Sequence, residues 1–385
     1  MQTDLNPFVY SRPIAPDDVI DRDEETSKLL GLAAGGHFVR LYAPRKYGKT
    51  SLLRRVLRDA EREEGMVPIL VDLYGALSLA DVAVRLERAY ARQLKGGLRA
   101  RVDEFLQGMG LGLSLSAMGI GARLQLQPKA DPLPALHALL DLPLRLEEGG
   151  GRRALIVLDE FQDVARISEL DAILRSHVQL QGEVASYVFA GSEPGLMKQL
   201  FEERDRPLYG QAVPIRLGRL ADADIAAYVA DRFRGTGREI GDALGPLLET
   251  AKGHPQRAML LAHRVWEVVA SGERATGTQW QLALETALLE LEPELDARWR
   301  RLTTTERKTV RAVLAGEGSP YRKAVLERLQ VGKASAQQAL RNLSARAEVE
   351  SREDGYALVD PLFAVWVERL GEQAPGEAWE PDAQV

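Results

Sequence analysis

Residues 37–51 of the chain read His-Phe-Val-Arg-Leu-Tyr-Ala-Pro-Arg-Lys-Tyr-Gly-Lys-Thr-Ser. The first six residues form a mainly apolar run that is typical of a buried strand, and the amphipathic stretch that follows predicts a helix. The Gly-Lys-Thr between them has the spacing of a P-loop, with Ala43 where the first glycine of that motif usually stands. The strand–loop–helix setting favours a phosphate-binding P-loop over a solvated basic loop.

Each residue type in this loop has a chemical role. Gly48 allows the backbone to approach a phosphate, and the amino end of the following helix offers free N–H groups to an anion. Lys49 is expected to reach the β and γ phosphates of a nucleotide, and the Thr50 hydroxyl is expected to bind Mg²⁺. The other predicted nucleotide-binding positions of the loop are Pro44, Arg45 and Ser51.

Polar residues end two further apolar runs. Asp159 and Glu160 directly follow residues 154–158. Because ligands bind at the carboxyl ends of strands in open α/β sheets, we expect Asp159 to hold Mg²⁺ through water and Glu160 to polarise the attacking water. Ser192 ends another run, where it would either face the γ-phosphate or cap the next helix. Together with the P-loop, these positions predict a site that hydrolyses a nucleoside triphosphate.

Short apolar runs alternate with helical stretches from about residue 24 to residue 216, which predicts an α/β fold with a parallel P-loop sheet. The predicted strands are residues 37–42, 66–73, 154–158, 187–190 and 213–217. Residues 108–127 alternate with period two and predict a β-hairpin, either packed on the sheet or protruding towards a partner. The pattern of residues 218–297 is helical and predicts a lid.

Residues 298–370 predict a winged-helix domain. Three helical patterns precede two strands around Asp354-Gly355, a strong hairpin signal. The predicted helices are residues 304–315, 322–329 and 334–346. We therefore expect a P-loop domain over residues 1–217, a lid over 218–297, a winged helix over 298–370 and a disordered acidic tail over 371–385.

The third helix of the predicted winged helix carries side chains that can pair with base edges. They are Gln337, Gln338, Arg341 and Asn342. The predicted phosphate contacts are Lys323, Lys333, Arg346 and Arg352. The domain has 14 basic and 9 acidic residues, a net charge of +5, which is modest for a nucleic-acid binder. Duplex DNA and a protein-binding or purely structural role therefore both stay open.

The composition of the chain excludes several classes of function. The chain has 385 residues, a formal net charge of −6 and no cysteine, which excludes disulfides, cysteine-ligated metals and cysteine nucleophiles. The start of the sequence lacks the pattern of a secretory signal, and no apolar run of about 18 residues could form a membrane-spanning helix. We therefore expect a soluble cytoplasmic protein without a membrane partner.

The motifs together resemble the archaeal-type AAA+ ATPases, which are related to the signal-transducing STAND NTPases and the origin-recognition ATPases. The matching segments are Asn6–Phe8, Val19–Glu25, Pro44–Leu52, Leu158–Glu160, Ala190–Ser192, Pro207–Gly210, Gly253–Pro255 and Asp360–Trp366. They span nearly the whole chain in the order found in that family. The resemblance implies that Val19 and Ile20 pack on the adenine and that Pro255 contacts the nucleotide from the lid.

Three departures from the family pattern bear on turnover and backbone geometry. Gln211 follows Pro-Leu-Tyr-Gly, where relatives commonly carry an arginine, so we expect Arg206 to supply any arginine finger. The other candidates for that role are Arg204, Arg216 and Arg219. Gln256 stands where origin-recognition relatives carry a sensor arginine, and Asp21 stands where relatives often have glycine. The two glutamines favour slow turnover.

The expected function is that of a Mg²⁺-dependent ATPase of the AAA+ or STAND-like type. It would couple its ATP or ADP state to duplex DNA or to a protein partner through the winged helix, as a monomer or a homo-oligomer. The alternatives are a slow nucleotide-gated switch and a DNA-binding regulator whose P-loop is structural. Glu160 argues against the last of these, because a structural site has no need of a group that activates water.

Overall fold

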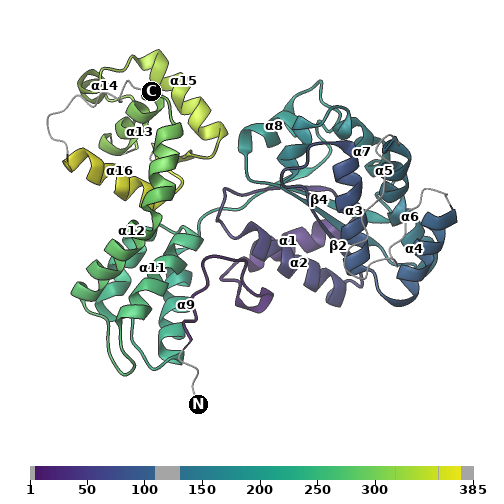
Figure 1. The fold of residues 1–385 in the computed structure, drawn as a ribbon, viewed down its shortest axis with the longest axis horizontal. Helices are drawn as coiled ribbons and strands as arrows, with labels where there is room; N and C mark the ends of the chain where they lie inside the picture. The colour runs from purple at the N-terminus through teal and green to yellow at the C-terminus, as the bar shows by residue number, and fades with distance from the viewer. Residues whose placement is uncertain (1–4, 109–130, 317, 354, 374–385) are drawn as a thin grey trace. The chain divides into compact units, whose positions relative to one another are not determined.

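The computed structural model describes residues 5–108, 131–316, 318–353 and 355–373 (Figure 1). The chain forms two compact units, residues 13–218 and residues 1–12 together with 219–385. We call them the sheet unit and the helical unit. The predicted β-hairpin at 108–127 lies outside the described residues, apart from Gly108 at the end of a helix.

A parallel five-stranded sheet forms the centre of the sheet unit, in the order β2-β3-β4-β1-β5. Its strands are β1 (Val39–Tyr42), β2 (Val67–Asp72), β3 (Ala154–Asp159), β4 (Ala185–Gly191) and β5 (Val213–Arg216). Every predicted strand overlaps one of these, so the predicted α/β fold with a parallel sheet is confirmed. The strand that ends before Ser192 lies between the P-loop strand and the strand that ends in Asp159.

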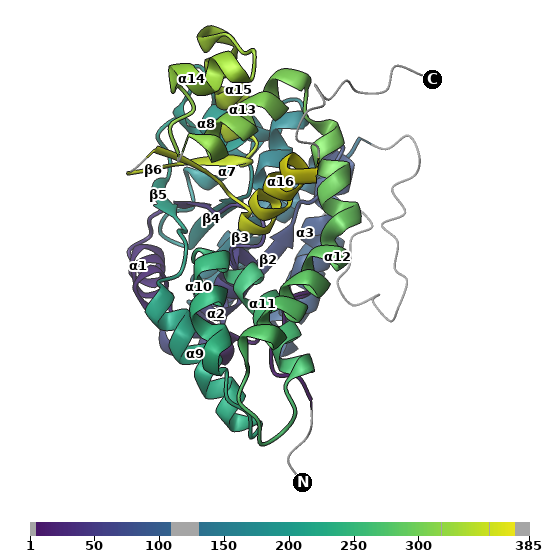
Figure 2. The same cartoon turned by 90° about the vertical axis from the view of Figure 1, so that its left-hand side faces the viewer.

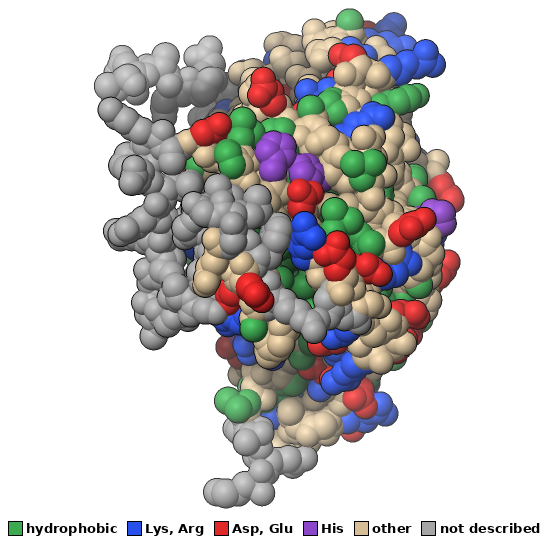
Figure 3. All heavy atoms as spheres, turned by 90° about the vertical axis from the view of Figure 1, so that its right-hand side faces the viewer, with side chains coloured by type: hydrophobic (Ala, Val, Ile, Leu, Met, Phe, Trp, Pro, Cys, Tyr) green, Lys and Arg blue, Asp and Glu red, His purple; other side chains and the backbone are tan. Residues whose placement is uncertain are grey.

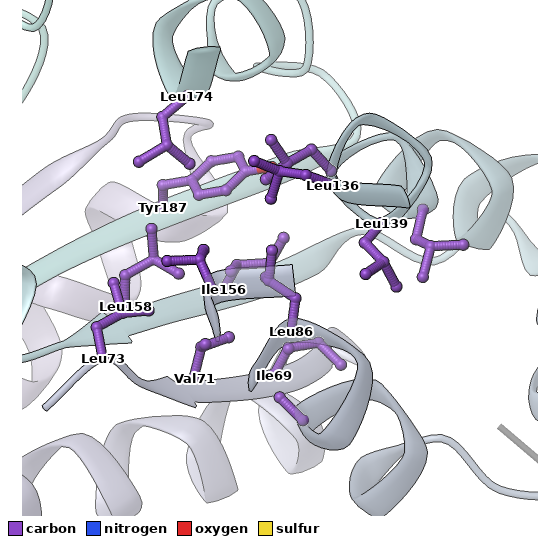
Figure 4. Close-up of a cluster of buried hydrophobic side chains, with 14 of the residues drawn as sticks. Ile69, Val71, Leu73, Leu86, Leu136, Leu139, Ile156, Leu158, Leu174 and Tyr187 are labelled. Carbon is purple, nitrogen blue, oxygen red and sulfur yellow. The ribbon is translucent and has the colours of Figure 1, made fainter. Parts of the chain in front are cut away.

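Helices surround this sheet. They are α1 (Asp23–Ala34), α2 (Lys49–Glu63), α3 (Leu79–Gln93), α4 (Gly96–Gly108), α5 (Leu133–Leu140), α6 (Leu142–Gly150), α7 (Leu170–Val178) and α8 (Pro194–Glu202). Strands β3 and β4 are buried along their whole length, as a parallel sheet covered on both faces requires. Figure 4 shows part of the core, where Ile156 and Leu158 of β3 lie near Tyr187 of β4 and Leu86 of α3.

The helical unit contains the segment predicted as lid and winged helix (Figure 2). Its first helices are α9 (Asp222–Gly235), α10 (Leu244–Ala251), α11 (Pro255–Val268) and α12 (Gly277–Arg301). They are followed by α13 (Thr304–Ala315), α14 (Lys323–Arg328), α15 (Lys333–Ala345), β6 (Val349–Arg352), β7 (Gly355–Leu358) and α16 (Pro361–Gln373). Strands β6 and β7 pair antiparallel, so the three helices and hairpin have the order predicted for a winged helix.

Capping residues fix where α12 and α13 begin. Thr276 and Gln279 form a capping box at the start of α12, and Thr303 and Glu306 form another at the start of α13. Each box satisfies two backbone N–H groups near the helix start. The proposed boundary between lid and winged helix at residues 297 and 298 falls inside α12 and stays a prediction.

The start of the chain lies with the helical unit, not with the P-loop domain to which the sequence pattern assigned it. Phe8 is 1% exposed, and its ring centroid lies 5.3 Å from that of Phe233 and 6.5 Å from that of Tyr228. The Asn6 side chain donates to the backbone oxygen of His263 at 3.1 Å. Full burial of a phenylalanine is worth about 2–3 kcal/mol, so this contact holds the segment on α9 and α11.

Two further boundaries differ from the expectation. The sheet unit ends at Gly218, one position after the predicted end of the P-loop domain at 217. Helix α16 continues to Gln373, so residues 371–373 are helical rather than part of a tail. The rest of the predicted tail lies outside the described residues.

Candidate nucleotide-binding site

The P-loop connects β1 to α2 with the backbone that the motif requires. Ala43 is fully buried and its N–H donates to the Gly191 oxygen at 3.2 Å, so it continues the strand and needs no glycine. Gly48 has φ 84°, in the left-handed region that glycine adopts freely, and is the N-cap of α2. Since a glycine has no side chain to cap the helix, the first N–H groups of α2 are left for an anion.

Lys49 and Glu160, two of the residues predicted for catalysis, meet the predicted metal ligands Thr50 and Asp159 at the carboxyl end of β3. The Lys49 ammonium contacts Asp159 Oδ1 and lies 2.7 Å from Glu160 Oε1. Thr50 Oγ1 lies 3.4 Å from Asp159 Oδ2. Lys49 is 6% exposed and Asp159 is 7% exposed, so this is an enclosed ion-pair cluster. The P-loop and the acidic pair, far apart in sequence, therefore form one site.

The environment acts differently on the two carboxyl groups. Burial raises the pKa of Asp159 above its ordinary value, although Lys49 opposes the effect. Burial also acts to raise the pKa of Glu160, but Lys49, Gln162 and Ser192 outweigh it and the pKa is lowered. Glu160 therefore stays ionised at neutral pH, which is the form that can polarise a water molecule.

The oxygen atoms of Thr50 and Asp159 fit a magnesium ion. Octahedral Mg²⁺ binds oxygen at about 2.1 Å, which places neighbouring ligands about 3 Å apart. Thr50 Oγ1 and Asp159 Oδ2 lie 3.4 Å apart, so an ion bound directly by Thr50 would have Asp159 within reach of one of its water ligands. A hydroxyl and a carboxylate are also the hard donors that this ion prefers.

Ser192 and Gln162 complete the polar cluster around Glu160. Ser192 Oγ donates to Glu160 Oε2 at 2.8 Å, and Gln162 Nε2 donates to the same oxygen at 2.6 Å. Helix α8 has Glu193 as its N-cap, so Ser192 does not take the alternative role of capping residue. The sequence analysis missed Gln162, whose only signal was its place two residues after Glu160.

Other predicted nucleotide contacts lie around the loop. Pro44 is buried and accepts the Tyr47 N–H at 3.3 Å, whereas Arg45 is exposed and 3.9 Å from Glu193. Ser51 Oγ accepts the backbone N–H of Ile14 at 3.2 Å, so this hydroxyl anchors the segment before α1. That interaction was not expected.

The segment predicted to pack on the adenine lies beside the P-loop helix. Val19 and Ile20 are half-buried and follow a short 3-10 helix (Pro16–Asp18) that packs against α2. Asp21 has φ 51°, in the left-handed region. A glycine would adopt this backbone angle without strain, which fits the family pattern expected at this position.

The arginine chosen as a possible finger is engaged within its own chain. Arg206 Nη2 lies 2.9 Å from Asp171 Oδ2 of α7, and Asp171 is 7% exposed. Arg219 lies in the helical unit, where it pairs with Glu350 at 2.6 Å. Pro255 begins α11 in the same unit, after His254, whose ring accepts the Arg257 N–H.

The candidate DNA-contacting residues lie on α15 and on the hairpin. Four of them share an exposed helix surface: Gln337, Gln338, Arg341 and Asn342. Lys333 is exposed at the start of the helix. Three of the predicted phosphate contacts pair with acids instead: Lys323 with Glu327 at 3.7 Å, Arg346 with Glu306 at 2.5 Å and Arg352 with Glu350 at 3.1 Å. These pairs lower the positive charge available to a phosphate backbone.

The sheet unit also mixes its charges. On the face shown in Figure 3, over α4, α5 and α6, Lys and Arg are interspersed with Asp and Glu among the described side chains. Over the described ranges, no helix combines the length and apolar character needed to cross a membrane.

The parallel sheet has the order β2-β3-β4-β1-β5, with a P-loop after β1 and an acidic pair at the end of β3. This arrangement defines the P-loop fold of the AAA+ ATPases. The sequence matches no family model and no curated protein. The chain is nevertheless similar over almost its whole length to solved structures of other proteins.

One of these structures is the Walker-type ATPase Paby2304 of Pyrococcus abyssi. It is 19% identical with a TM-score of 0.68, over 93% of this chain and 99% of that chain. Another is the ORC2 protein of Aeropyrum pernix in ADPNP–ADP complexes, 15% identical with a TM-score of 0.59, over 96% of this chain and 98% of that chain. The ADP form of ORC2 gives a TM-score of 0.55. At these identities the comparisons confirm the expected AAA+ fold.

Proposed function

We propose that this protein is a Mg²⁺-dependent ATPase that couples its nucleotide state to duplex DNA or to a protein partner through the segment α13–α16. The observation that carries the proposal is the convergence of Lys49, Asp159 and Glu160 beside the uncapped start of α2. A P-loop used only for structure would not need an ionised carboxylate beside the phosphate-binding lysine.

The cluster must rearrange when a nucleotide binds. The Lys49 ammonium is shared between two carboxylates, and the oxygens of a triphosphate would compete with them for this cation. Once Lys49 turns to the phosphates, one oxygen of Glu160 is released and can orient a water molecule towards the γ-phosphate. Mg²⁺ would be held by Thr50 and Asp159 and would neutralise negative charge on the phosphate oxygens.

Two substitutions test the proposed site. Lys49→Ala should abolish ATP binding measured by calorimetry, whereas the control Lys28→Ala, an exposed lysine of α1, should leave binding unchanged. Glu160→Gln should keep ATP binding and lose hydrolysis, measured as phosphate release. Unchanged affinity in Lys49→Ala would contradict the P-loop assignment, and a fully active Glu160→Gln would remove this residue from catalysis.

A slow nucleotide-gated switch is the second candidate function. It is favoured by Gln211 at the position where relatives commonly carry an arginine, and by the pairing of Arg206 with Asp171. Without an arginine at the γ-phosphate, P-loop hydrolysis is slower by orders of magnitude. Steady-state hydrolysis at several protein concentrations, with and without duplex DNA and at two salt concentrations, separates the two candidates. Flat, slow hydrolysis supports the switch; salt-sensitive stimulation by DNA supports the DNA-dependent ATPase.

The exposed side chains of α15 are the basis for proposing DNA as a partner. Arg341 and Asn342 both hydrogen-bond Gln338, so these three present donors and acceptors together. The double substitution Gln338→Ala and Arg341→Ala should weaken duplex binding in a fluorescence anisotropy titration. The control Arg300→Ala removes an exposed arginine of α12 and should have little effect. If the parent protein has no salt-sensitive affinity for DNA, the segment is a protein-binding module.

A further inference from the structure

The side chain of Gln162 joins the ends of two adjacent strands of the site. It is 1% exposed, and its Nε2 donates to Glu160 Oε2 at 2.6 Å. Its Oε1 accepts the backbone N–H of Ser192 at 3.2 Å. The Ser192 hydroxyl donates to the same oxygen of Glu160 at 2.8 Å, which closes a ring of three hydrogen bonds. We call this arrangement the Glu–Gln–Ser ring.

The chemistry of the two neighbours matches the amide at position 162. An ionised carboxylate can only accept hydrogen bonds, and a backbone N–H can only donate one. A side chain that bridges them must therefore carry a donor and an acceptor on neighbouring atoms, as the glutamine amide does. A glutamate at this position would place a second carboxylate against Glu160. An apolar side chain would leave the Ser192 N–H without its acceptor and would remove one of the two donors to Glu160 Oε2.

The Gln162 side chain passes close to the backbone at position 191, and a glycine at that position leaves room for it. A Cβ atom on Gly191 would lie 2.9 Å from Gln162 Oε1 and 2.5 Å from Met197 Sδ, both closer than normal contact. Gly191 therefore gives Gln162 the space to reach from Glu160 across to β4.

The backbone conformation of Glu160 is a second reason to expect contacts that hold this residue in place. Glu160 has φ 53°, in the left-handed region, which costs a residue other than glycine about 1–2 kcal/mol. Such a conformation persists where surrounding contacts hold it. The Glu–Gln–Ser ring supplies two of these contacts at Oε2, and the third, at Oε1, comes from Lys49. When a nucleotide draws Lys49 away, the ring would be the contact that still orients the carboxylate.

We propose that Gln162 is a positioning residue that fixes the carboxylate of Glu160 and the backbone of Ser192 in one orientation. This inference rests on the proposed function, because Glu160 is the group assigned there to orient the attacking water. Gln162 acts through these two neighbours and is not assigned a contact with the nucleotide. Its effect should therefore appear in the rate of hydrolysis and not in ATP affinity.

Kinetic epistasis between positions 160 and 162 tests the inference. Gln162→Met keeps the length of the side chain and removes both hydrogen bonds. We expect kcat to fall about 10- to 100-fold, as for a misplaced catalytic group, with unchanged ATP affinity in calorimetry. In a Glu160→Gln background the same substitution should produce no further fall in the residual rate of hydrolysis, measured in single turnover, because residues that act as a unit are not additive.

Hydrogen exchange at the Ser192 amide provides a readout that needs no activity. Gln162→Met should speed this exchange, because the N–H loses its acceptor, whereas Gln162→Glu keeps an acceptor there and should not. Gln162→Glu should still lower kcat, since it cannot donate to Glu160 when ionised. The matched control is Gln181→Met. Gln181 is also 1% exposed, bonds to Leu140 and Tyr187, and should leave both kcat and Ser192 exchange unchanged.

The outcomes separate this inference from the proposed function. A Gln162→Met variant that hydrolyses ATP at the parent rate, or whose kcat falls equally in the Glu160→Gln background, overturns the positioning role while the ATPase stands. If the parent protein hydrolyses no ATP, the proposed function fails, and Ser192 exchange then decides alone. Unchanged exchange in Gln162→Met would show that the ring does not hold Ser192 and would overturn the inference.

Discussion

Replacing Arg257 with methionine should cost the helical unit about 3 kcal/mol of unfolding free energy. The Arg257 side chain is fully buried and forms a two-point pair with Asp360, with Nε 2.9 Å from Oδ1 and Nη2 2.5 Å from Oδ2. Removing one partner of a buried ion pair costs about 3–5 kcal/mol, because the other charge is left uncompensated. Arg298 lies 3.1 Å from Asp360 and partly compensates, which places the loss at the lower end.

A double-mutant cycle isolates the pair itself. Asp360→Asn removes the charge but keeps an oxygen that can accept the Leu362 N–H at the start of α16. If Arg257 acts mainly through this carboxylate, Arg257→Met should cost much less in the Asp360→Asn background. We expect an interaction free energy of about 2 kcal/mol between the two positions, within the range known for residues in direct contact.

Tryptophan fluorescence follows this unit alone, because every tryptophan of the sequence lies after residue 218. They are Trp266, Trp280, Trp299, Trp366 and Trp379. Urea unfolding followed by fluorescence therefore gives the stability of the helical unit. The control Arg300→Met removes an exposed arginine paired with Asp296 at 3.0 Å and should cost less than about 1 kcal/mol. An Arg257→Met variant as stable as this control, or two single substitutions that simply add, would refute the reasoning.

Three further outcomes follow from the same contacts. Although burial opposes the effect, Arg257 holds the pKa of Asp360 far below its ordinary value. The helical unit should therefore lose stability as pH falls below about 4. An Arg257→Met variant with the same acid sensitivity in urea unfolding would contradict this. Burial raises the pKa of Glu87 to about 7, so stability of the sheet unit should fall as pH rises from about 4.5 to about 7. Glu87→Gln should therefore raise the unfolding free energy of the sheet unit by about 2 kcal/mol at pH about 8 and by little at pH about 4. Hydrogen exchange in α3 measures this, and equal gains at both pH values would contradict the raised pKa of Glu87. Gly191→Ala should displace Gln162 and lower kcat with little change in ATP affinity; parent-like kcat would show that the close approach at Gly191 is unimportant.

The strands were predictable because continuous apolar runs have few other ways to be buried. The limits of this reasoning show at β4, which begins at Ala185 rather than at Tyr187. Ser186 looks like a polar residue before a strand, yet it is fully buried because its hydroxyl donates to the Ala33 oxygen of α1. Only the folded chain supplies that acceptor.

The convergence of the candidate site residues was predictable where a local motif fixes the chemistry, as in Gly48, Lys49 and Asp159. Gln162 was not, because a glutamine after an acidic pair has the same local pattern whether it is exposed or buried. The contact of Phe8 with α9 could not be predicted from the sequence either. Its partner helix lies more than two hundred residues away in the sequence, and no periodicity connects the two segments.

The order of the two units along the chain has a consequence for synthesis and folding. Residues 13–218 form an insertion within the chain of the helical unit, which begins before them and resumes after them. On the ribosome, the P-loop sheet can fold while the surface that receives Phe8 has not yet been made. Docking of Asn6 and Phe8 is therefore a late event that joins a segment made before the sheet unit to one made after it. A fragment starting at Arg219 should accept residues 5–12 as a separate peptide.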